Sequence, residues 1–473
     1  MSRVSRMPLE SGPDFHVSRP DLRPSSSDVW FISYLPLALS DGISSPLIPL
    51  LALVLFRPSP LVVSTVIAAS ALSEVPFTIL WGNLSDRVRH RKYFLVGSFF
   101  ATGLTLVAMP FSHSFAQYFF VNVANGLATA ASAPIGTMLL LETRTKRWWP
   151  RDIGLFGLIS GVGTVLGLAT GFLWLTILVP GTLVAARVLF AMKFLFLVAG
   201  ALAFLSALTA WHWVEEPTSQ MDRRSVEDLL AFSHGVVERL RGARRRVVHI
   251  VELARGNPEP IPRSEWIFLV ALFVMSAGFQ LFYGPLVFFL SSPAGGGLDQ
   301  ANIFLVFLIS ALASTSLFYH SGLAVEYASP KWVFLASLLA RVALIPAFLT
   351  VPSALRSVPW ALTLTYAGLN GLMGVTWAFL STASTLFLVR LVGVTNKGKA
   401  LGLYNALAGF GGLAGTVAGG WLYVGFGVGF TYGFAAFVVL IGALILLPIR
   451  YHRTPFAHVP LPLRVPARKR GSG

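Results

Sequence analysis

The chain has 473 residues, of which 55% are hydrophobic and only 12% are charged, and its mean hydropathy is +0.71. Soluble domains have about 25% charged residues, so we expect the lipid bilayer to be the solvent of this chain. The absence of cysteine excludes disulfides, thiolate metal sites and cysteine nucleophiles. The net charge of +16 does not indicate nucleic-acid binding, because the basic residues lie almost wholly between the apolar segments.

Taken from the N-terminus, residues 1–28 are polar and lack the apolar core of a cleaved signal peptide. A membrane-spanning helix needs about 20 predominantly apolar residues. Twelve segments meet this requirement, and their approximate ranges are 30–53, 60–82, 93–111, 115–140, 153–178, 186–211, 266–290, 302–320, 332–351, 359–387, 400–424 and 428–448. The sequence therefore predicts an all-α membrane protein with 12 transmembrane helices.

The distribution of basic residues predicts how the helices are oriented. Of the 36 Lys and Arg residues, 31 lie on the side that holds both termini, and two, Lys193 and Arg341, lie inside spans. The opposite side has only Arg57, Arg187 and Arg356. Since loops rich in Lys and Arg face the cytoplasm, we expect both termini in the cytoplasm and a multi-pass protein in the cell membrane.

The longest polar segment, 212–265, divides the chain into six-helix halves at 29–211 and 266–449, followed by a basic cytoplasmic tail at 450–473. Within this linker, residues 225–256 have an apolar face and many arginines. That pattern predicts an amphipathic helix on the inner surface of the membrane.

The two halves also match in sequence. Five glycines of the fifth span recur with the same spacing in the eleventh: Gly154, Gly161, Gly163, Gly167 and Gly171 match Gly402, Gly409, Gly411, Gly415 and Gly419. Asn125–Gly126 of the fourth span likewise matches Asn370–Gly371 of the tenth. Two pseudo-symmetric six-helix halves are the architecture of transporters whose substrate site lies between the halves near the bilayer midplane.

A motif at the cytoplasmic end of the second span is typical of one family. It reads Gly82-Asn-Leu-Ser-Asp86-Arg87-Val-Arg-His-Arg91-Lys92. This resembles the signature of the major facilitator superfamily, G-x-x-x-D-[RK]-x-G-x-[RK]-[RK], with Arg89 in place of the usual glycine. A degraded second copy has Gly322, Glu326 and Lys331 at the corresponding positions. The resemblance implies that these residues hold the halves closed on the cytoplasmic side.

The same resemblance implies a secondary active transporter that moves a small molecule by alternating access, without a cofactor. Spans 1, 4, 7 and 10 would line the cavity, and spans 3, 6, 9 and 12 would lie outermost. We expect a monomer whose partners are the small-molecule substrate, the lipid bilayer and protons. The glycine-rich fifth span slightly favours export. The R-x-x-Q-G motif of many proton-coupled members reads Asn122-Val-Ala-Asn125-Gly126 here, without the arginine.

Ionisable residues inside spans indicate function because they are costly to insert in lipid. Asp41 lies near the middle of the first span, and the alignment of Pro46 with Pro285 pairs it with Gln280. Asp41 and Gln280 are therefore candidates for transport or coupling, as are Glu74, Asn125 and Asn370. Hydrogen bonding or packing between helices is the alternative for each of them. The small number of charged candidates favours a neutral or apolar substrate, and the sequence gives no role for Arg341.

Two other classes of function remain open at this stage. A membrane-embedded lipid-modifying enzyme would show clustered aspartates or histidines at one membrane face, and no such cluster is evident. A non-transporting membrane scaffold has no excluding feature. The segment from Gly409 to Ala414 fits a nucleotide-binding fingerprint, but no strand precedes it. We therefore expect a protein that is not an enzyme and that has no metal site.

Overall fold

The computed structural model describes residues 30–56, 59–88, 91–132, 135–136, 139, 149–179, 185–214, 263–355, 358–391 and 397–449. These residues are helical apart from short turns and loops. The predicted N-terminal tail, the amphipathic linker helix and the basic C-terminal tail lie outside the described residues.

The helices follow the order of the predicted spans. The first half has α1 (Tyr34–Leu55), α2 (Pro60–Val88), α3 (Arg91–Ala108), α4 (Phe115–Thr129), α6 (Trp149–Leu178) and α7 (Ala185–Trp213). The second half has α10 (Arg263–Ser291), α11 (Gln300–Tyr327), α12 (Pro330–Leu355), α13 (Pro359–Leu391) and α14 (Lys397–Leu446). Short 3-10 turns lie at Trp30–Ser33, Met109–Phe111 and Pro293–Gly295. The predicted all-α membrane fold is confirmed.

Within the described residues, 10 helices are long and apolar enough to cross a membrane. One of them, α14, has 50 residues and breaks at Gly427, where φ is 79° and ψ is 172°. Glycine tolerates this left-handed conformation because it has no Cβ. The break lies between the two last predicted spans, so α14 contains both. The described part of α4 has 15 residues and covers only part of its predicted span.

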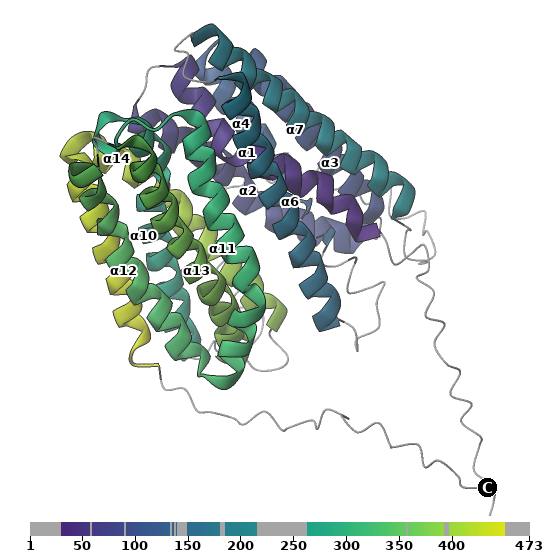
Figure 1. The fold of residues 1–473 in the computed structure, drawn as a ribbon. Helices are drawn as coiled ribbons and strands as arrows, with labels where there is room; N and C mark the ends of the chain where they lie inside the picture. Colours follow the sequence, from purple (N-terminus) through teal and green to yellow (C-terminus); the bar gives the residue numbers. More distant parts are fainter. Residues whose placement is uncertain are drawn as a thin grey trace, which may run out of the picture.

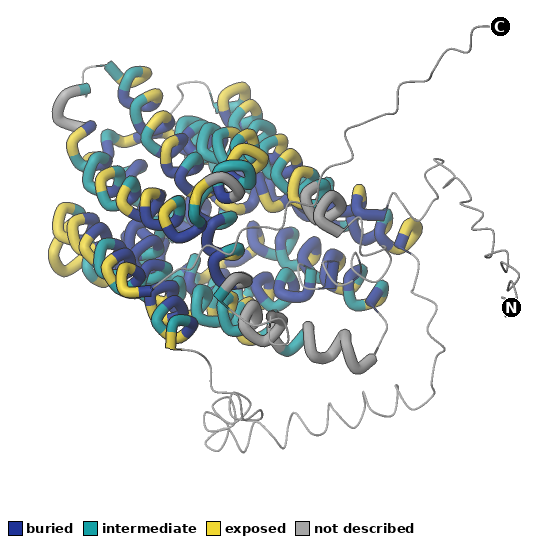
Figure 2. Tube along the Cα trace, turned by 90° about the horizontal axis from the view of Figure 1, so that it is seen from below, coloured by how far each residue is buried: buried dark blue, intermediate teal, exposed yellow. Residues whose placement is uncertain are grey.

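Each half forms its own helical bundle, and the two bundles lie side by side (Figure 1). The main neighbours of α3 and α7 are all in the first half, and those of α12 are all in the second half. These three helices therefore lie outermost, as the family resemblance implies. Buried residues gather where helices face one another, whereas exposed residues lie mainly along outer helix faces (Figure 2).

Glycines bring equivalent helices together in the two halves. Gly167 of α6 lies against the backbone of Leu39 in α1, with no room for a Cβ. Gly415 of α14 lies in the same way against Ala277 in α10. Close approach of helix backbones through small residues is the usual packing in membranes. The predicted glycine repeat is thus the packing surface of two equivalent helix pairs.

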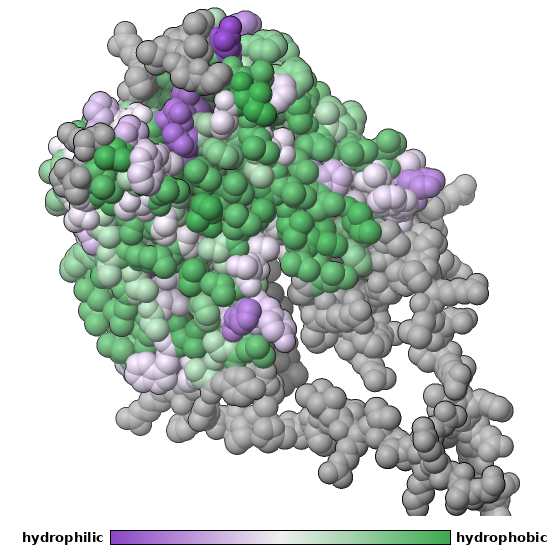
Figure 3. Space-filling view, in the orientation of Figure 1, coloured by the Kyte–Doolittle hydropathy of each residue, from purple (hydrophilic) through white to green (hydrophobic). Residues whose placement is uncertain are grey.

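The outer surface of both bundles is apolar. Leu104, Phe120, Trp360 and Phe437 belong to a larger set of exposed hydrophobic side chains. Hydrophobic residues cover most of the face shown in Figure 3, across elements of both halves. A surface of this kind matches a lipid environment rather than water.

Candidate functional site: a cavity between the two halves

A cavity of about 560 Å³ lies at the junction of the two bundles. Most of its wall comes from α10, α11, α12, α13 and α14 of the second half. The first half contributes Ser45 from α1 together with Thr164 and Leu168 from α6. The volume is in the range of small-molecule sites, which are mostly apolar with a few polar groups.

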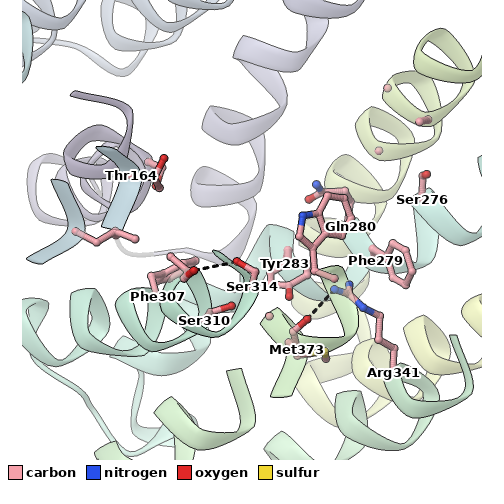
Figure 4. A pocket seen from close by; sticks show the side chains of 18 residues that line it. Thr164, Ser276, Phe279, Gln280, Tyr283, Phe307, Ser310, Ser314, Arg341 and Met373 are labelled. Atoms are coloured by element: carbon pink, nitrogen blue, oxygen red, sulfur yellow. Dashed lines mark hydrogen bonds between the residues drawn. The ribbon is translucent and has the colours of Figure 1, made fainter. Parts of the chain in front are cut away.

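Arg341 is the cation of this cavity (Figure 4). Its Nε donates a 3.0 Å hydrogen bond to the Thr376 hydroxyl, and its Nη2 donates another of 3.0 Å to the Met373 carbonyl. Its guanidinium carbon lies 4.6 Å from the centre of the Phe279 ring and 5.6 Å from that of Trp377. The side chain is 2% exposed. Its partners α10 and α13 thus fix the guanidinium in one position.

The sequence did not assign this role, because Arg341 belongs to an outer helix. The structure confirms that α12 is outermost, yet the long side chain extends inward to α10 and α13. The signal in the sequence was an arginine in the middle of an apolar span. Such residues usually face the bundle interior and mark function.

Asp41 and Glu74 of the first half do not line the cavity, but each lies close in the chain to a residue that lines or contacts it. Many protein atoms lie around both side chains, yet both side chains have a large accessible surface. This combination is expected of groups that face an open space between helices. Ser45, one turn from Asp41 and on the same face of α1, lines the cavity. Val75, next to Glu74, contacts the cavity residue Gly409.

The two carboxylates act on each other electrostatically. Neither of them accepts a hydrogen bond or forms an ion pair with any residue that the structure describes. The first half therefore places two acidic groups near one another, both without a partner among the described residues, and the second half places one arginine in the cavity wall.

The three predicted amide residues have different surroundings. Gln280 lines the cavity, where its Oε1 lies 3.4 Å from the Thr416 hydroxyl. Asn125 is buried and accepts a 2.8 Å hydrogen bond from Thr105 of α3. Asn370 is buried and donates a 3.0 Å hydrogen bond to the Val306 carbonyl of α11. Gln280 is thus placed at the cavity, whereas Asn125 and Asn370 join helices away from it.

The contacts also correct the register of the internal repeat in spans 4 and 10. Asn122 donates to the carbonyl of Val66 in α2, just as Asn370 donates to Val306 in α11. The equivalent of Asn370 is therefore Asn122 and not Asn125. The sequence match was wrong here because an Asn-Gly pair recurs one turn away from the structurally equivalent position.

The alignment of α1 with α10 also needs a correction, of one residue, and this affects the pairing of Asp41 with Gln280. Gly163 lies against Leu35 of α1, and its repeat partner Gly411 lies against Phe273 of α10. Continued along both helices, this equivalence pairs Asp41 with Phe279, which stacks on Arg341. Gln280 still lines the cavity, but the alignment of prolines placed it one residue away from the true equivalent of Asp41.

The signature motif lies at the junction of α2 and α3. The last turns of α2 contain Gly82, Asp86 and Arg87. The side chains of Asp86 and Arg87 lie outside the described residues, as does that of Glu326 in α11. Arg91 begins α3 and is buried, and the Lys92 ammonium lies 5.4 Å from the centre of the Trp211 ring.

In the second copy of the motif, Lys331 donates two 2.7 Å hydrogen bonds, to the carbonyls of Leu447 and Ile449. It thus caps the end of α14, which suits a cation because helix carbonyls are left unpaired there. A Cβ added at Gly322 would meet no atom within 4 Å, so this glycine does not mark a close helix contact here.

Among the described residues, no group of three or more His, Asp or Glu side chains is arranged to hold a metal ion. The polar chemistry of the cavity wall thus rests on one arginine, a glutamine and several hydroxyl groups, and the carboxylates of Asp41 and Glu74 lie close to residues that border it. These groups can bind a small molecule and exchange protons.

Comparison with known proteins decides the family. The family model described as Major Facilitator Superfamily matches residues 30–366. The chain belongs to the major facilitator superfamily. A search of curated protein sequences gave no match.

Solved structures of major facilitator transporters share this fold. The nucleoside transporter NupG has a TM-score of 0.61 and 14% identity, with 89% of this chain and 98% of that chain covered. The xylose transporter XylE from E. coli, in an inward open conformation, has a TM-score of 0.64 and 13% identity, covering 89% and 96%. A peptide transporter, POT, has a TM-score of 0.63 and 13% identity, covering 90% and 95%. At such low identity the likeness establishes the fold alone.

Proposed function

We propose that this protein is a secondary active transporter that moves a small molecule across the cytoplasmic membrane by alternating access. The observation that carries the proposal is the cavity between the two halves, with polar groups from both. A substrate bound there touches both bundles, so a rocking motion of one bundle against the other can carry it from one side to the other.

Contacts between the halves support an inward-facing conformation. Gly284 of α10 and Gly420 of α14 both lie against Ser64, one turn into α2. Gly171, near the end of α6, lies against Phe304, near the start of α11. All these positions belong to the helix ends that we predict to face outside. Among the described residues the halves thus touch at the outer end and near the middle, and we infer that the cavity opens toward the cytoplasm.

Asp41 is our principal candidate for the coupling group, and Glu74 is the secondary one. Both lie near the junction of the halves, and both lack a partner among the described residues. A carboxylate in that position can take a proton when the cavity faces one side and release it on the other. We propose protons as the coupling ion and export as the direction.

Uptake and efflux measured in proteoliposomes, with and without an imposed pH gradient, test this function. We expect concentrative movement of at least one compound when a gradient is present, and simple exchange when it is absent. The same protein reconstituted without a gradient is the control. Failure of a broad panel of small molecules to cross under both conditions contradicts the proposal and favours a non-transporting scaffold.

A further inference from the structure

The charge of Arg341 is buried, and no described acidic residue neutralises it. Its hydrogen-bond acceptors are the Thr376 hydroxyl and the Met373 carbonyl. Both are neutral, and no acidic side chain of the described residues acts on the guanidinium. Removal of a charge from water is costly unless an opposite charge lies nearby. A site of this kind favours a bound anion.

The neutral partners orient the guanidinium without cancelling its charge. Thr376 itself donates to the Met373 carbonyl at 2.8 Å, so the two acceptors of Arg341 are fixed to each other on α13. Guanidinium has five N–H groups in a planar fork and binds carboxylates with paired hydrogen bonds. The fork is thus held rigid at the cavity wall before any ligand binds.

The aromatic side chains around Arg341 favour a ligand that is apolar apart from its anionic group. Phe279 and Trp377 stack on the guanidinium and also line the cavity, where Phe307 adds a third ring (Figure 4). Aromatic walls exclude water and so strengthen an ion pair formed between them. The hydroxyl groups of Ser276 and Ser310 are among the additional polar groups of the cavity wall.

We propose that Arg341 binds the carboxylate of a small organic anion whose aromatic or apolar body fills the remaining cavity. This inference rests on the proposed transport function, because it names the substrate class of the same cavity. It also replaces the neutral substrate expected from the sequence, since the sequence placed no cation in the cavity. Thr376 is a positioning residue, because it acts on the anion only through the guanidinium.

Equilibrium dialysis of the purified, detergent-solubilised protein tests the inference directly. The probes are benzoate, phenylacetate and 3-phenylpropionate, each compared with its primary amide of nearly identical size. We expect at least one acid to bind saturably and tenfold or more tightly than its amide. If no acid binds in preference to its amide, the proposal is overturned.

Variants separate the role of the cation from general damage to the fold. Arg341→Met should abolish the preference for the acid, and Arg341→Lys should retain part of it, because lysine keeps the charge but loses the planar fork. Thr376→Val should weaken acid binding several-fold with little effect on amide binding, even if Arg341→Met fails to fold. Lys193→Met is the matched control, because it removes a cation from another outer helix, α7, and should leave the preference unchanged. A preference that persists in both Arg341→Met and Thr376→Val overturns the proposal.

Transport of the same acids in proteoliposomes distinguishes this inference from the proposed function. If the acids bind through Arg341 but nothing crosses the membrane, the transport function is contradicted while the anion site stands. If neutral compounds cross the membrane but the acids neither bind nor cross in preference to their amides, the function stands and the anion site is contradicted.

Discussion

Nε of Arg341 lies 3.0 Å from the hydroxyl oxygen of Thr376, and this hydrogen bond ties an outer helix to the wall of the central cavity. Nothing in the helical pattern of α12 predicts that contact, because it depends on the position of α13. The bond explains how Arg341 can act inside the cavity although the backbone of its helix, α12, lies away from the interface between the two bundles. The charge of the cavity wall is thus on the side of the second half, since the first half contributes only Ser45, Thr164 and Leu168 to it.

Replacement of Asp41 tests its role in coupling. If Asp41 carries the coupling proton, Asp41→Asn should abolish transport driven by a pH gradient, with at least a tenfold fall in initial rate, and should retain exchange at zero gradient. The amide keeps the size and polarity of the side chain but cannot lose a proton. Both modes are measured in proteoliposomes.

Glu74→Gln is the companion variant and should have a smaller effect than Asp41→Asn. If Asp41 instead binds a cationic substrate, Asp41→Asn should abolish exchange as well. Unchanged gradient-driven transport in Asp41→Asn contradicts both roles and leaves Asp41 a structural residue.

Replacement of glycines tests the packing of equivalent helix pairs. Gly167→Ala and Gly415→Ala each place a methyl group against the backbone of the neighbouring helix, at Leu39 and at Ala277. Overpacking of this kind costs about 1–3 kcal/mol, so we expect a lower thermal unfolding temperature for each purified variant.

The controls come from the same two helices. A Cβ added at Gly157 of α6 or at Gly433 of α14 would meet no atom within 4 Å. Because alanine favours helix over glycine by about 1 kcal/mol, Gly157→Ala and Gly433→Ala should be neutral or slightly stabilising. Equal destabilisation by all four replacements shows that close helix approach is not the cause.

The signature motif is tested by Asp86→Asn. We predict that Asp86 stabilises a closed cytoplasmic side rather than the fold, since it lies near a loop where water can solvate its replacement. Transport should fall markedly while the amount of protein in the membrane stays near that of the wild type. Loss of the protein from the membrane indicates a folding role, and normal transport excludes the gate.

The orientation is tested with single cysteines, which is possible because the chain has none of its own. An impermeant thiol reagent applied outside intact cells should label Arg57→Cys and Arg356→Cys but not Leu240→Cys. All three positions lie outside the described residues, so the expectation rests on the distribution of basic residues alone. Labelling of Leu240→Cys from outside reverses the predicted topology.

The amino-acid sequence by itself determined that the chain lies in a lipid bilayer, where its helices are and to which family it belongs. Apolar segments of about 20 residues, charges confined to the gaps and a short Gly-Asp-Arg motif are local properties, and each can be read without knowledge of the neighbouring helices. The glycine repeat identified the packing surfaces of α6 and α14, because close backbone approach requires small residues in register. The sequence also singled out Asp41, Glu74 and Gln280 as candidates, because polar residues in apolar spans are rare.

Only the tertiary structure decided which side chains meet. The equivalence of Asn122 with Asn370 follows from their donation to Val66 and Val306, and a recurring Asn-Gly pair had obscured it in the sequence. Arg341 reaches the cavity wall because Thr376 and the Met373 carbonyl of α13 accept its hydrogen bonds and the Phe279 ring of α10 lies against its guanidinium. Helical periodicity gives the face of a residue on its own helix, but the destination of a long side chain depends on the rotation of every neighbouring helix, and no local pattern encodes that rotation.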